Sequence, residues 1–265
     1  NLSLNRLVNL GVFKLVKNEF QPSLIEGNYL DAFYYLSPLE KKSFRFEVLA
    51  KTNSANYQGT ELNINWSNRN TFRGAELLSI SIFGGYEVQI SGQNNGYNVY
   101  RIGTEANLIW PRMISPIRFK MSNRFTPKTK ATLGYEFQDR QQLYRLQTFK
   151  ALFGYNWKEN ARREHTLNIG EVIFARPQNV TQLYLDEVKL NPSLGKVIER
   201  QLIFGPTYSY TYSNTAQRRK KNTIYYKGTI DLSAAVTGLI AGANIDKRDM
   251  LKVFGVPFSQ YVKFE

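Results

Sequence analysis

The sequence predicts an all-β protein built around one large antiparallel sheet, and three observations favour this class. Apolar and polar residues alternate with a period of two in one segment after another, for example in Ser43 to Lys51. Aromatic residues, which favour strands, are abundant: the 265 residues include 17 Tyr, 17 Phe and 3 Trp. Turn-forming stretches such as Gly92 to Gly96 (GQNNG) separate the alternating segments.

The composition excludes several other classes of protein. Hydrophobic residues make up 42% of the chain, which argues against intrinsic disorder. The absence of cysteine excludes disulfides and thiolate metal sites. The longest run of small and apolar residues, Leu232 to Ala243, is much shorter than the roughly 20 residues of a membrane-spanning helix. A mean hydropathy of −0.40 fits a soluble protein, and it equally fits a membrane barrel whose strands each have one polar face.

The chain begins with elements of mixed type. Leu4 to Phe20 predicts a short amphipathic helix, a stop at Gly11 and the start of a strand. A second strand is expected from Tyr29 to Leu36. Because the pattern then changes, we expect residues 1–40 to be the C-terminal part of an α+β domain and residues 41–265 to be all-β.

The first strand of the all-β part is Ser43 to Lys51, in which one face is apolar and the other mostly charged. The apolar face consists of Phe44, Phe46, Val48 and Ala50, and the other face consists of Arg45, Glu47, Leu49 and Lys51. If all strands follow this pattern, a row of charges faces the same side of the sheet: Arg45, Glu47, Arg101, Glu105, Glu136, Lys227 and Asp231.

Further strands are expected along the rest of the chain, for a total of about ten membrane-length strands. They are Glu61 to Ser67, Ala75 to Ile90, Tyr97 to Trp110, Ala131 to Gln138, Phe149 to Trp157, Thr166 to Phe174, Ile203 to Tyr212, Ile224 to Leu232 and Phe258 to Glu265. Gly84-Gly85 suggests a bulge or bend. Ala175 to Arg200 breaks the alternation and predicts an excursion with one or two short helices.

Two architectures fit this pattern, a transmembrane β-barrel and a soluble β-sandwich. Many of the strands approach the 9–11 residues of a tilted membrane strand, whereas sandwich strands are usually about 5–6 residues long. Trp66, Trp110, Trp157 and the tyrosines of 208–212 lie near strand ends, as in the aromatic girdles of membrane barrels. The pattern therefore favours an antiparallel transmembrane barrel, with the sandwich as the alternative.

The start of the chain resembles a specific junction in a known family. The similarity is to the end of the last POTRA domain and the first barrel strand of the BamA/TamA outer-membrane assembly family. It rests on Leu7 to Val16 (LVNLGVFKLV), the two following strands, Pro38 and the immediate entry into an alternating strand. Asn68 to Gly85 (NRNTFRGAELLSISIFGG) resembles that family's turn between its second and third strands. Trp110 to Pro116 (WPRMISP) resembles the turn after the fourth.

Two later stretches look more like one branch of the family. Leu190 to Tyr212 and Phe254 to Glu265 resemble the TamL-type lipoprotein branch more than BamA itself. The family's Arg-Gly motif on an inward-folded loop, which belongs to its later barrel strands, is not found here.

The resemblance implies a location and an activity. It implies about ten strands of a bacterial outer-membrane barrel of about sixteen, with the N-terminal part in the periplasm. The implied function is assembly, insertion or translocation of unfolded client outer-membrane proteins. Outer-membrane lipids and a periplasmic or inner-membrane partner bound through POTRA domains are the other implied partners. The implied site is a lateral gate, the backbone of Ser43 to Lys51, which would template client strands.

The resemblance also implies the sidedness of the turns. Basic residues in turns on the periplasmic side include Arg162, Arg163, Arg218, Arg219, Lys220 and Lys221. The excursion at 175–200 and the loop at 238–256 would face the outside of the cell. Anionic lipid headgroups are one ligand for these basic turns, and plain solvation is the alternative.

Nucleic acid binding and catalysis are disfavoured. The net charge of +14 is spread over turns rather than gathered in one groove, so we expect no nucleic-acid partner. His165 is the sole histidine of the sequence and lies at a predicted turn without a nucleophile placed by a motif. We therefore expect no enzyme, no catalytic residue, no cofactor and no metal. Two alternatives to an assembly factor stay open: a passive porin or secretion pore, and a soluble β-rich binding module.

Overall fold

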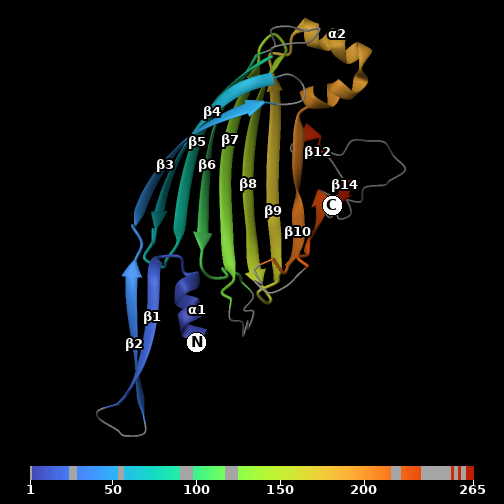
Figure 1. Cartoon of the computed structure of the whole chain (residues 1–265). Helices are drawn as coiled ribbons and strands as arrows, with labels where there is room; N and C mark the ends of the chain where they lie inside the picture. Colours follow the sequence, from blue (N-terminus) through green and yellow to red (C-terminus); the bar gives the residue numbers. More distant parts are fainter. Residues whose placement is uncertain are drawn as a thin grey trace.

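The computed structural model describes residues 2–23, 29–52, 57–89, 98–116, 125–215, 222–233, 252–253, 256–257 and 261–265. Within these ranges the chain forms a small N-terminal unit followed by a broad, curved sheet (Figure 1). The predicted turn at Gly92 to Gly96, the basic residues 218–221 and most of the loop at 238–256 lie outside the described residues.

The N-terminal unit consists of one helix and a strand pair within the described residues. Helix α1 spans Leu2–Asn9, and strands β1 (Phe13–Pro22) and β2 (Leu30–Pro38) pair antiparallel. Gly11 has a φ of 70°, a left-handed conformation that glycine adopts without steric cost at the end of a helix. The predicted helix, glycine stop and two strands are therefore confirmed.

The described part of the chain contains a ten-stranded antiparallel sheet, called the large sheet below. Its strands are β3 (Lys42–Thr52), β4 (Tyr57–Arg69), β5 (Leu77–Gln89), β6 (Val99–Trp110), β7 (Lys128–Arg140), β8 (Tyr144–Lys158), β9 (Arg163–Gln178), β10 (Gln201–Ser213), β11 (Tyr225–Ser233) and β14 (Tyr261–Phe264). Each strand from β3 to β10 pairs with the strand that follows it in the chain, and β11 pairs with β14. A separate short pair is formed by β12 (Lys252–Val253) and β13 (Val256–Pro257).

The large sheet is open within the described residues. Its edge strands are β3 and β14, and they do not pair with each other. The prediction of about ten antiparallel strands is confirmed. A closed barrel is not observed, and the membrane location stays a prediction.

The excursion between β9 and β10 begins later than predicted. Ala175 to Gln178 continue β9 and pair with β8, so the alternation-breaking residues start after the strand. Helix α2 (Gln182–Leu190) and the 3-10 helix η1 (Pro192–Ile198) follow, which confirms the prediction of one or two short helices. The ring of Tyr184 in α2 packs against Tyr144 of β8, with centroids 4.9 Å apart, and both are buried. This contact holds the excursion against the end of the sheet.

The predicted bulge at Gly84-Gly85 is wrong, because the pairing of β5 with both neighbours is continuous there. The irregularity lies instead in β9, where Ile169 is an extra residue between consecutive pairs with β8. A glycine in the neighbouring strand makes room for Phe83, because a Cβ on Gly103 would clash with the Phe83 ring.

The two ends of the large sheet carry different structures (Figure 1). The N-terminal unit lies at one end, together with the turns that join β4 to β5, β6 to β7 and β8 to β9. The α2 and η1 excursion lies at the opposite end. None of the described helices is long and apolar enough to span a membrane.

Candidate functional site

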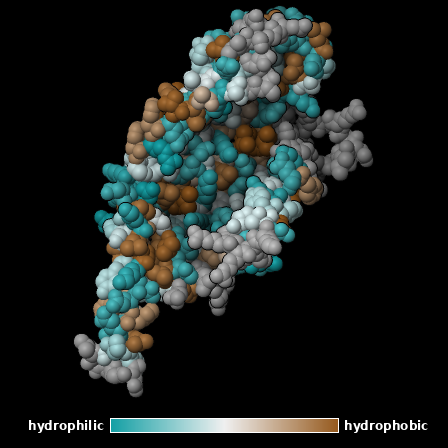
Figure 2. Space-filling view, viewed as in Figure 1, coloured by the Kyte–Doolittle hydropathy of each residue, from teal (hydrophilic) through white to brown (hydrophobic). Residues whose placement is uncertain are grey.

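One face of the large sheet is apolar, and its side chains are exposed. The register places Phe46, Ile64 and Ile82 in one row across β3, β4 and β5. Ile82 is 51% exposed, and Leu133 on the same face of β7 is 65% exposed. Figure 2 shows hydrophobic residues reaching the surface of the molecule in several patches. Neighbouring exposed apolar side chains of this kind are typical of an interaction surface.

The opposite face, called the polar face below, is hydrogen-bonded and more buried. Ser67 and Thr132 lie in one row across the sheet and are 9% and 3% exposed. The Thr132 hydroxyl donates to Asn107 Oδ1 at 2.7 Å, and Asn65 Nδ2 donates to Ser81 Oγ at 2.8 Å. In this row the polar side chains are therefore less exposed than Ile82 and Leu133, whereas charged side chains on β3 such as Arg45 are exposed. This arrangement is the reverse of that in a protein surrounded by water.

Ion pairs on the polar face link four of its strands. Lys51 Nζ and Arg101 Nη2 each lie 2.5 Å from Glu61 Oε2, and Arg101 Nε lies 4.0 Å from Glu136 Oε1. This network joins β3, β4, β6 and β7. The register places all the charges predicted to share one face on the polar face: Arg45, Glu47, Arg101, Glu105, Glu136, Lys227 and Asp231.

The predicted gate segment lies entirely within β3, at the edge of the large sheet. Ser43 to Lys51 pair with β4 in an unbroken register, and the other edge of β3 pairs with no strand in the described part of the chain. Most side chains of β3, including Phe44 and Val48, are exposed. Arg69 Nη1 donates to the carbonyl of Glu40 at 3.2 Å, which ties the entry of β3 to the end of β4.

The turn between β4 and β5, which carries part of the family resemblance, is built around a buried carboxylate. Glu76 is 3% exposed, and its Oε2 accepts hydrogen bonds from the backbone N–H groups of Phe72 at 3.2 Å and Gly74 at 2.9 Å. Burial alone would raise the pKa of Glu76. The backbone hydrogen bonds from Glu76 itself, Gly74 and Phe72, with the charge of Arg112, outweigh it and hold the pKa below its usual value.

The same turn is held in an unusual backbone conformation. Asn70, Arg73 and Ala75 have positive φ angles of 63°, 67° and 62°. The amide oxygen of Asn70 accepts from the Ala75 N–H at 2.9 Å and supports this conformation. Sequence reasoning identified the turn but missed Glu76. A carboxylate two residues after a turn glycine was the available signal.

Aromatic rings gather on the apolar face near the end of the sheet that carries the N-terminal unit. Trp157 stacks on His165 with centroids 5.1 Å apart and an interplanar angle of 6°. His165 Nδ1 is 2.8 Å from the Tyr208 hydroxyl, and the ring of Tyr210 lies 5.3 Å away. Near the other end of the sheet, Tyr86 and Tyr100 stack at 4.5 Å.

This arrangement corrects the location predicted for the histidine. His165 lies within β9 and not in a turn. Glu159 is its nearest carboxylate, at 3.8 Å from Nε2. Among the described residues, no group of three or more acidic or histidine side chains could hold a metal ion.

The predicted basic turns are described in part. Arg162 and Arg163 lie at the turn between β8 and β9, where Asn160 Oδ1 accepts from both backbone N–H groups at 2.9 and 3.0 Å. Arg163 Nη1 also pairs with Glu159 at 3.2 Å. Arg218, Arg219, Lys220 and Lys221 lie outside the described residues.

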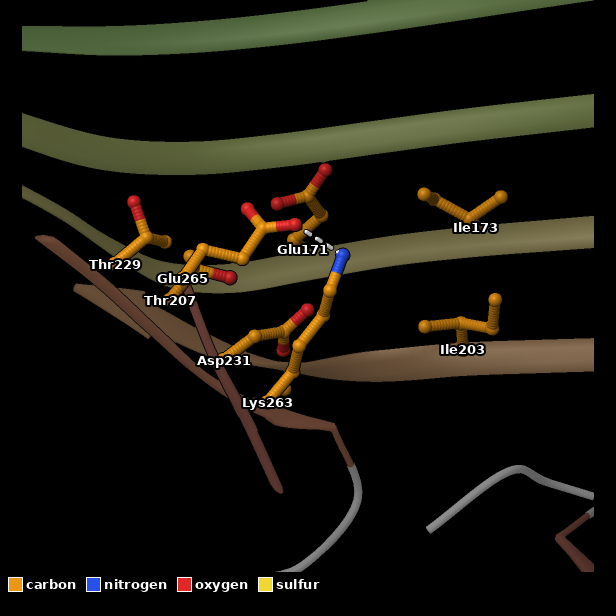
Figure 3. A pocket seen from close by; sticks show the side chains of 9 residues that line it. Glu171, Ile173, Ile203, Thr207, Thr229, Asp231, Lys263 and Glu265 are labelled. Carbon is orange, nitrogen blue, oxygen red and sulfur yellow. Dashed lines mark ion pairs between the residues drawn. The ribbon is translucent and has the colours of Figure 1, made fainter. Parts of the chain in front are cut away.

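A hollow lies on the polar face among the last strands of the large sheet (Figure 3). Its volume is about 210 Å³, and it lies among β9, β10, β11 and β14. Three carboxylates line it, from Glu171, Asp231 and Glu265, and Lys263 forms an ion pair with Glu265. Lys150 of β8 pairs with Glu171 at 3.5 Å. Positive and negative charges are therefore mixed in this part of the polar face.

No protein-family profile matches the sequence, and no curated protein matches it either.

Proposed function

We propose that this chain is part of a bacterial outer-membrane β-barrel, with the apolar face of the large sheet in lipid and the polar face around a water-filled interior. The observation that carries the proposal is the reversed exposure of the two faces. Side chains such as Ile82 and Leu133 are exposed, whereas Thr132 on the opposite face is buried in hydrogen bonds. A sheet in water is stable with the opposite arrangement, but a sheet in a bilayer requires this one.

The spacing of the aromatic rings supports the same proposal. Tyr100 and Trp110 lie near the two ends of β6, ten residues apart. At about 3.3 Å per residue they are separated by about 33 Å along the strand. A strand tilt of about 40° reduces this to about 25 Å along the membrane normal, which is the height of the apolar band of such barrels.

The proposed activity is assembly of client proteins at the edge strand β3. An exposed edge offers a row of backbone N–H and C=O groups that can pair with an incoming strand, as in β-augmentation. Position also supports this role, because β3 directly follows the N-terminal unit, whose sequence resembles a POTRA domain. In this proposal the backbone of Ser43 to Lys51 acts and the side chains have a secondary role.

A pair of substitutions at Val48 tests the activity in the full-length protein. Val48→Pro removes a backbone donor from the edge strand and fixes φ, so insertion of client barrels should be lost. Val48→Ala keeps the backbone and shortens one exposed side chain, so insertion should be nearly normal. Rates of client folding into vesicles containing each variant give the comparison. Normal client folding with the Pro variant would contradict the gate.

Sidedness has its own test in intact cells. Ser193, in the excursion, and Thr215, beyond β10, lie at opposite ends of β10. An impermeant thiol reagent should label Ser193→Cys and leave Thr215→Cys unmodified. Labelling of Thr215→Cys in place of Ser193→Cys would reverse the orientation.

A passive pore is the second candidate. The paired charges on the polar face, such as Glu61 with Lys51 and Arg101, are typical of a water-filled channel wall. A passive pore would show steady conductance in planar bilayers, and the two Val48 variants would leave the folding of other barrels unchanged.

A further inference from the structure

A second hollow of about 680 Å³ lies on the polar face, at the end of the large sheet next to the N-terminal unit. Four residues form a row across its floor: Lys158, Glu164, Thr211 and Lys227, from β8, β9, β10 and β11. The β8–β9 turn closes one side of it with Arg162. This space is called the basic groove below.

The charges that line the basic groove are strongly unbalanced. Four cations line it, Lys158, Arg162, Arg163 and Lys227, against the single carboxylate of Glu164. Lys158 Nζ is 3.4 Å from Glu164, and Arg163 is paired with Glu159. Among the described residues, Arg162 and Lys227 have no carboxylate within 4.0 Å. The lining of the groove therefore has more positive than negative charge, although Glu265, outside the groove, also attracts Lys227.

This imbalance is local to one end of the polar face. Further along β9 and β11, Glu171 and Asp231 line the hollow of Figure 3 together with Lys263. On β11 the charge changes from Lys227 to Asp231 within four residues on the same face. Along these last strands the unpaired cations and the carboxylates are therefore separated into two regions of the polar face.

The lining also carries uncharged donors. The lining includes the hydroxyl groups of Ser209, Thr211, Ser213 and Thr166, and Tyr225 forms part of the wall. Ser209 and Ser213 also share hydrogen bonds with Thr229 and Thr215, and Thr166 accepts one from Asn156. Hydroxyl groups and cations together suit carboxylates and backbone carbonyls. The space is large enough for several residues of an extended chain, since one residue of protein occupies on the order of 100–150 Å³ at interior packing density.

We infer that the basic groove binds an acidic segment of an extended polypeptide. Lipid headgroups are the other common source of anions, but the groove lies on the polar face and the sheet separates it from the apolar face. The inference rests on the proposed function in one respect: a client chain that approaches from the end with the N-terminal unit would meet the basic groove before it meets the mixed charges beyond.

The test uses the full-length protein in detergent and a fluorescent ten-residue peptide rich in Glu, with a Gln-rich peptide of the same length as the reference. The double variant Arg162→Gln with Lys227→Gln should weaken binding of the Glu peptide by about three- to tenfold. Lys128→Gln with Lys130→Gln is the matched control, because both residues lie on the same face and end of β7 outside the groove. The control should bind as the wild type does.

Several results would overturn the inference. Equal binding of the Gln and Glu peptides would remove the role of charge, and equal losses in both double variants would remove the role of the groove. Displacement of the Glu peptide by micromolar tripolyphosphate would assign the groove to phosphate ligands instead. If the double variant Arg162→Gln with Lys227→Gln does not fold, a second experiment takes its place, in which the photocrosslinker p-benzoylphenylalanine is introduced at position 225. Absence of a crosslink between this protein and the Glu peptide then contradicts the inference.

The outcome is independent of the assembly activity. Peptide binding is measured without client folding, so a functional insertase with no groove affinity would contradict only this inference. Conversely, a Val48→Pro protein that inserts clients normally would contradict only the proposed gate.

Discussion

The two faces of the large sheet differ in exposure in the direction opposite to that of soluble proteins. On one face Phe46, Ile82 and Leu133 present hydrocarbon to the surroundings, and on the other Ser67 and Thr132 are buried in hydrogen bonds. Since successive side chains of a strand point to opposite faces, a shift of register by one residue would exchange the faces. The difference between the faces therefore depends on the register of every strand, and the proposed contact of one face with lipid depends on it too.

The largest expected effect comes from a charge on the apolar face. Ile64→Arg, near the middle of β4, should destabilise the full-length protein in vesicles by about 2–4 kcal/mol because the guanidinium would lie near the bilayer midplane. Asn63→Arg is the matched change one residue earlier, where the side chain faces Glu47 across the strand pair. It should change the free energy of unfolding by less than about 1 kcal/mol. Urea unfolding of both variants gives the values, and equal effects would contradict the assignment of faces.

In the turn between β4 and β5, at the end of the sheet, the buried carboxylate of Glu76 provides the next test. Glu76→Ala would leave the N–H groups of Phe72 and Gly74 without an acceptor, which should destabilise the turn by about 1–3 kcal/mol. Hydrogen exchange of the Phe72 and Gly74 amides measures this loss of stability of the turn. Unchanged protection would show that water replaces the carboxylate without loss.

The same group gives the turn a pH dependence. Because the pKa of Glu76 is lowered on folding, its contribution is complete above the pKa of an unfolded Glu, about 4.3, and is lost as the pH falls through the lower folded value. Protection of the Phe72 and Gly74 amides, corrected for intrinsic exchange, should therefore decrease below about pH 4.3. Glu76→Gln should remove this dependence. A pH dependence that persists in Glu76→Gln would assign it to another group.

The smallest effect is expected on the polar face. Glu61→Gln removes the charge between Lys51 and Arg101. If that face lines water, the loss should be about 1 kcal/mol or less, because solvent screens the two remaining cations. A dry interior would instead give a loss of about 3–5 kcal/mol, since unpaired charges would stay buried. The free energy of unfolding of Glu61→Gln, measured in urea, therefore distinguishes a water-filled interior from the dry core of a soluble protein.

Sequence alone predicted the features that depend on local periodicity. Alternation in Ser43 to Lys51 located β3 to within a residue or two at each end, and Gly11 marked the end of α1. The row of charges that includes Arg45 and Glu47 was also assigned to one face, because the side-chain period of a strand is fixed at two.

Features that depend on contacts between distant residues were not predictable in this way. The Thr129 hydroxyl accepts from the Ile114 N–H at 2.9 Å and donates to the Arg112 carbonyl, and Tyr155 donates to the Ile114 carbonyl at 2.6 Å. These bonds fold the segment after β6 onto the sheet. The extra residue at Ile169 likewise follows from the fit of β9 to β8, and no local pattern encodes it.

The central claim, that the apolar face lies in lipid and the polar face in water, is tested most directly at two adjacent positions in the middle of β5. Ile82 lies on the apolar face, and Ser81 lies on the polar face beside Asn65. A small fluorophore is attached to Ile82→Cys or to Ser81→Cys in the full-length protein in vesicles. Brominated lipids should quench the probe at position 82 and leave the probe at position 81 bright, and aqueous iodide should do the reverse. Quenching of both probes by iodide and of neither by brominated lipid would show that both faces meet water, and the account would be wrong.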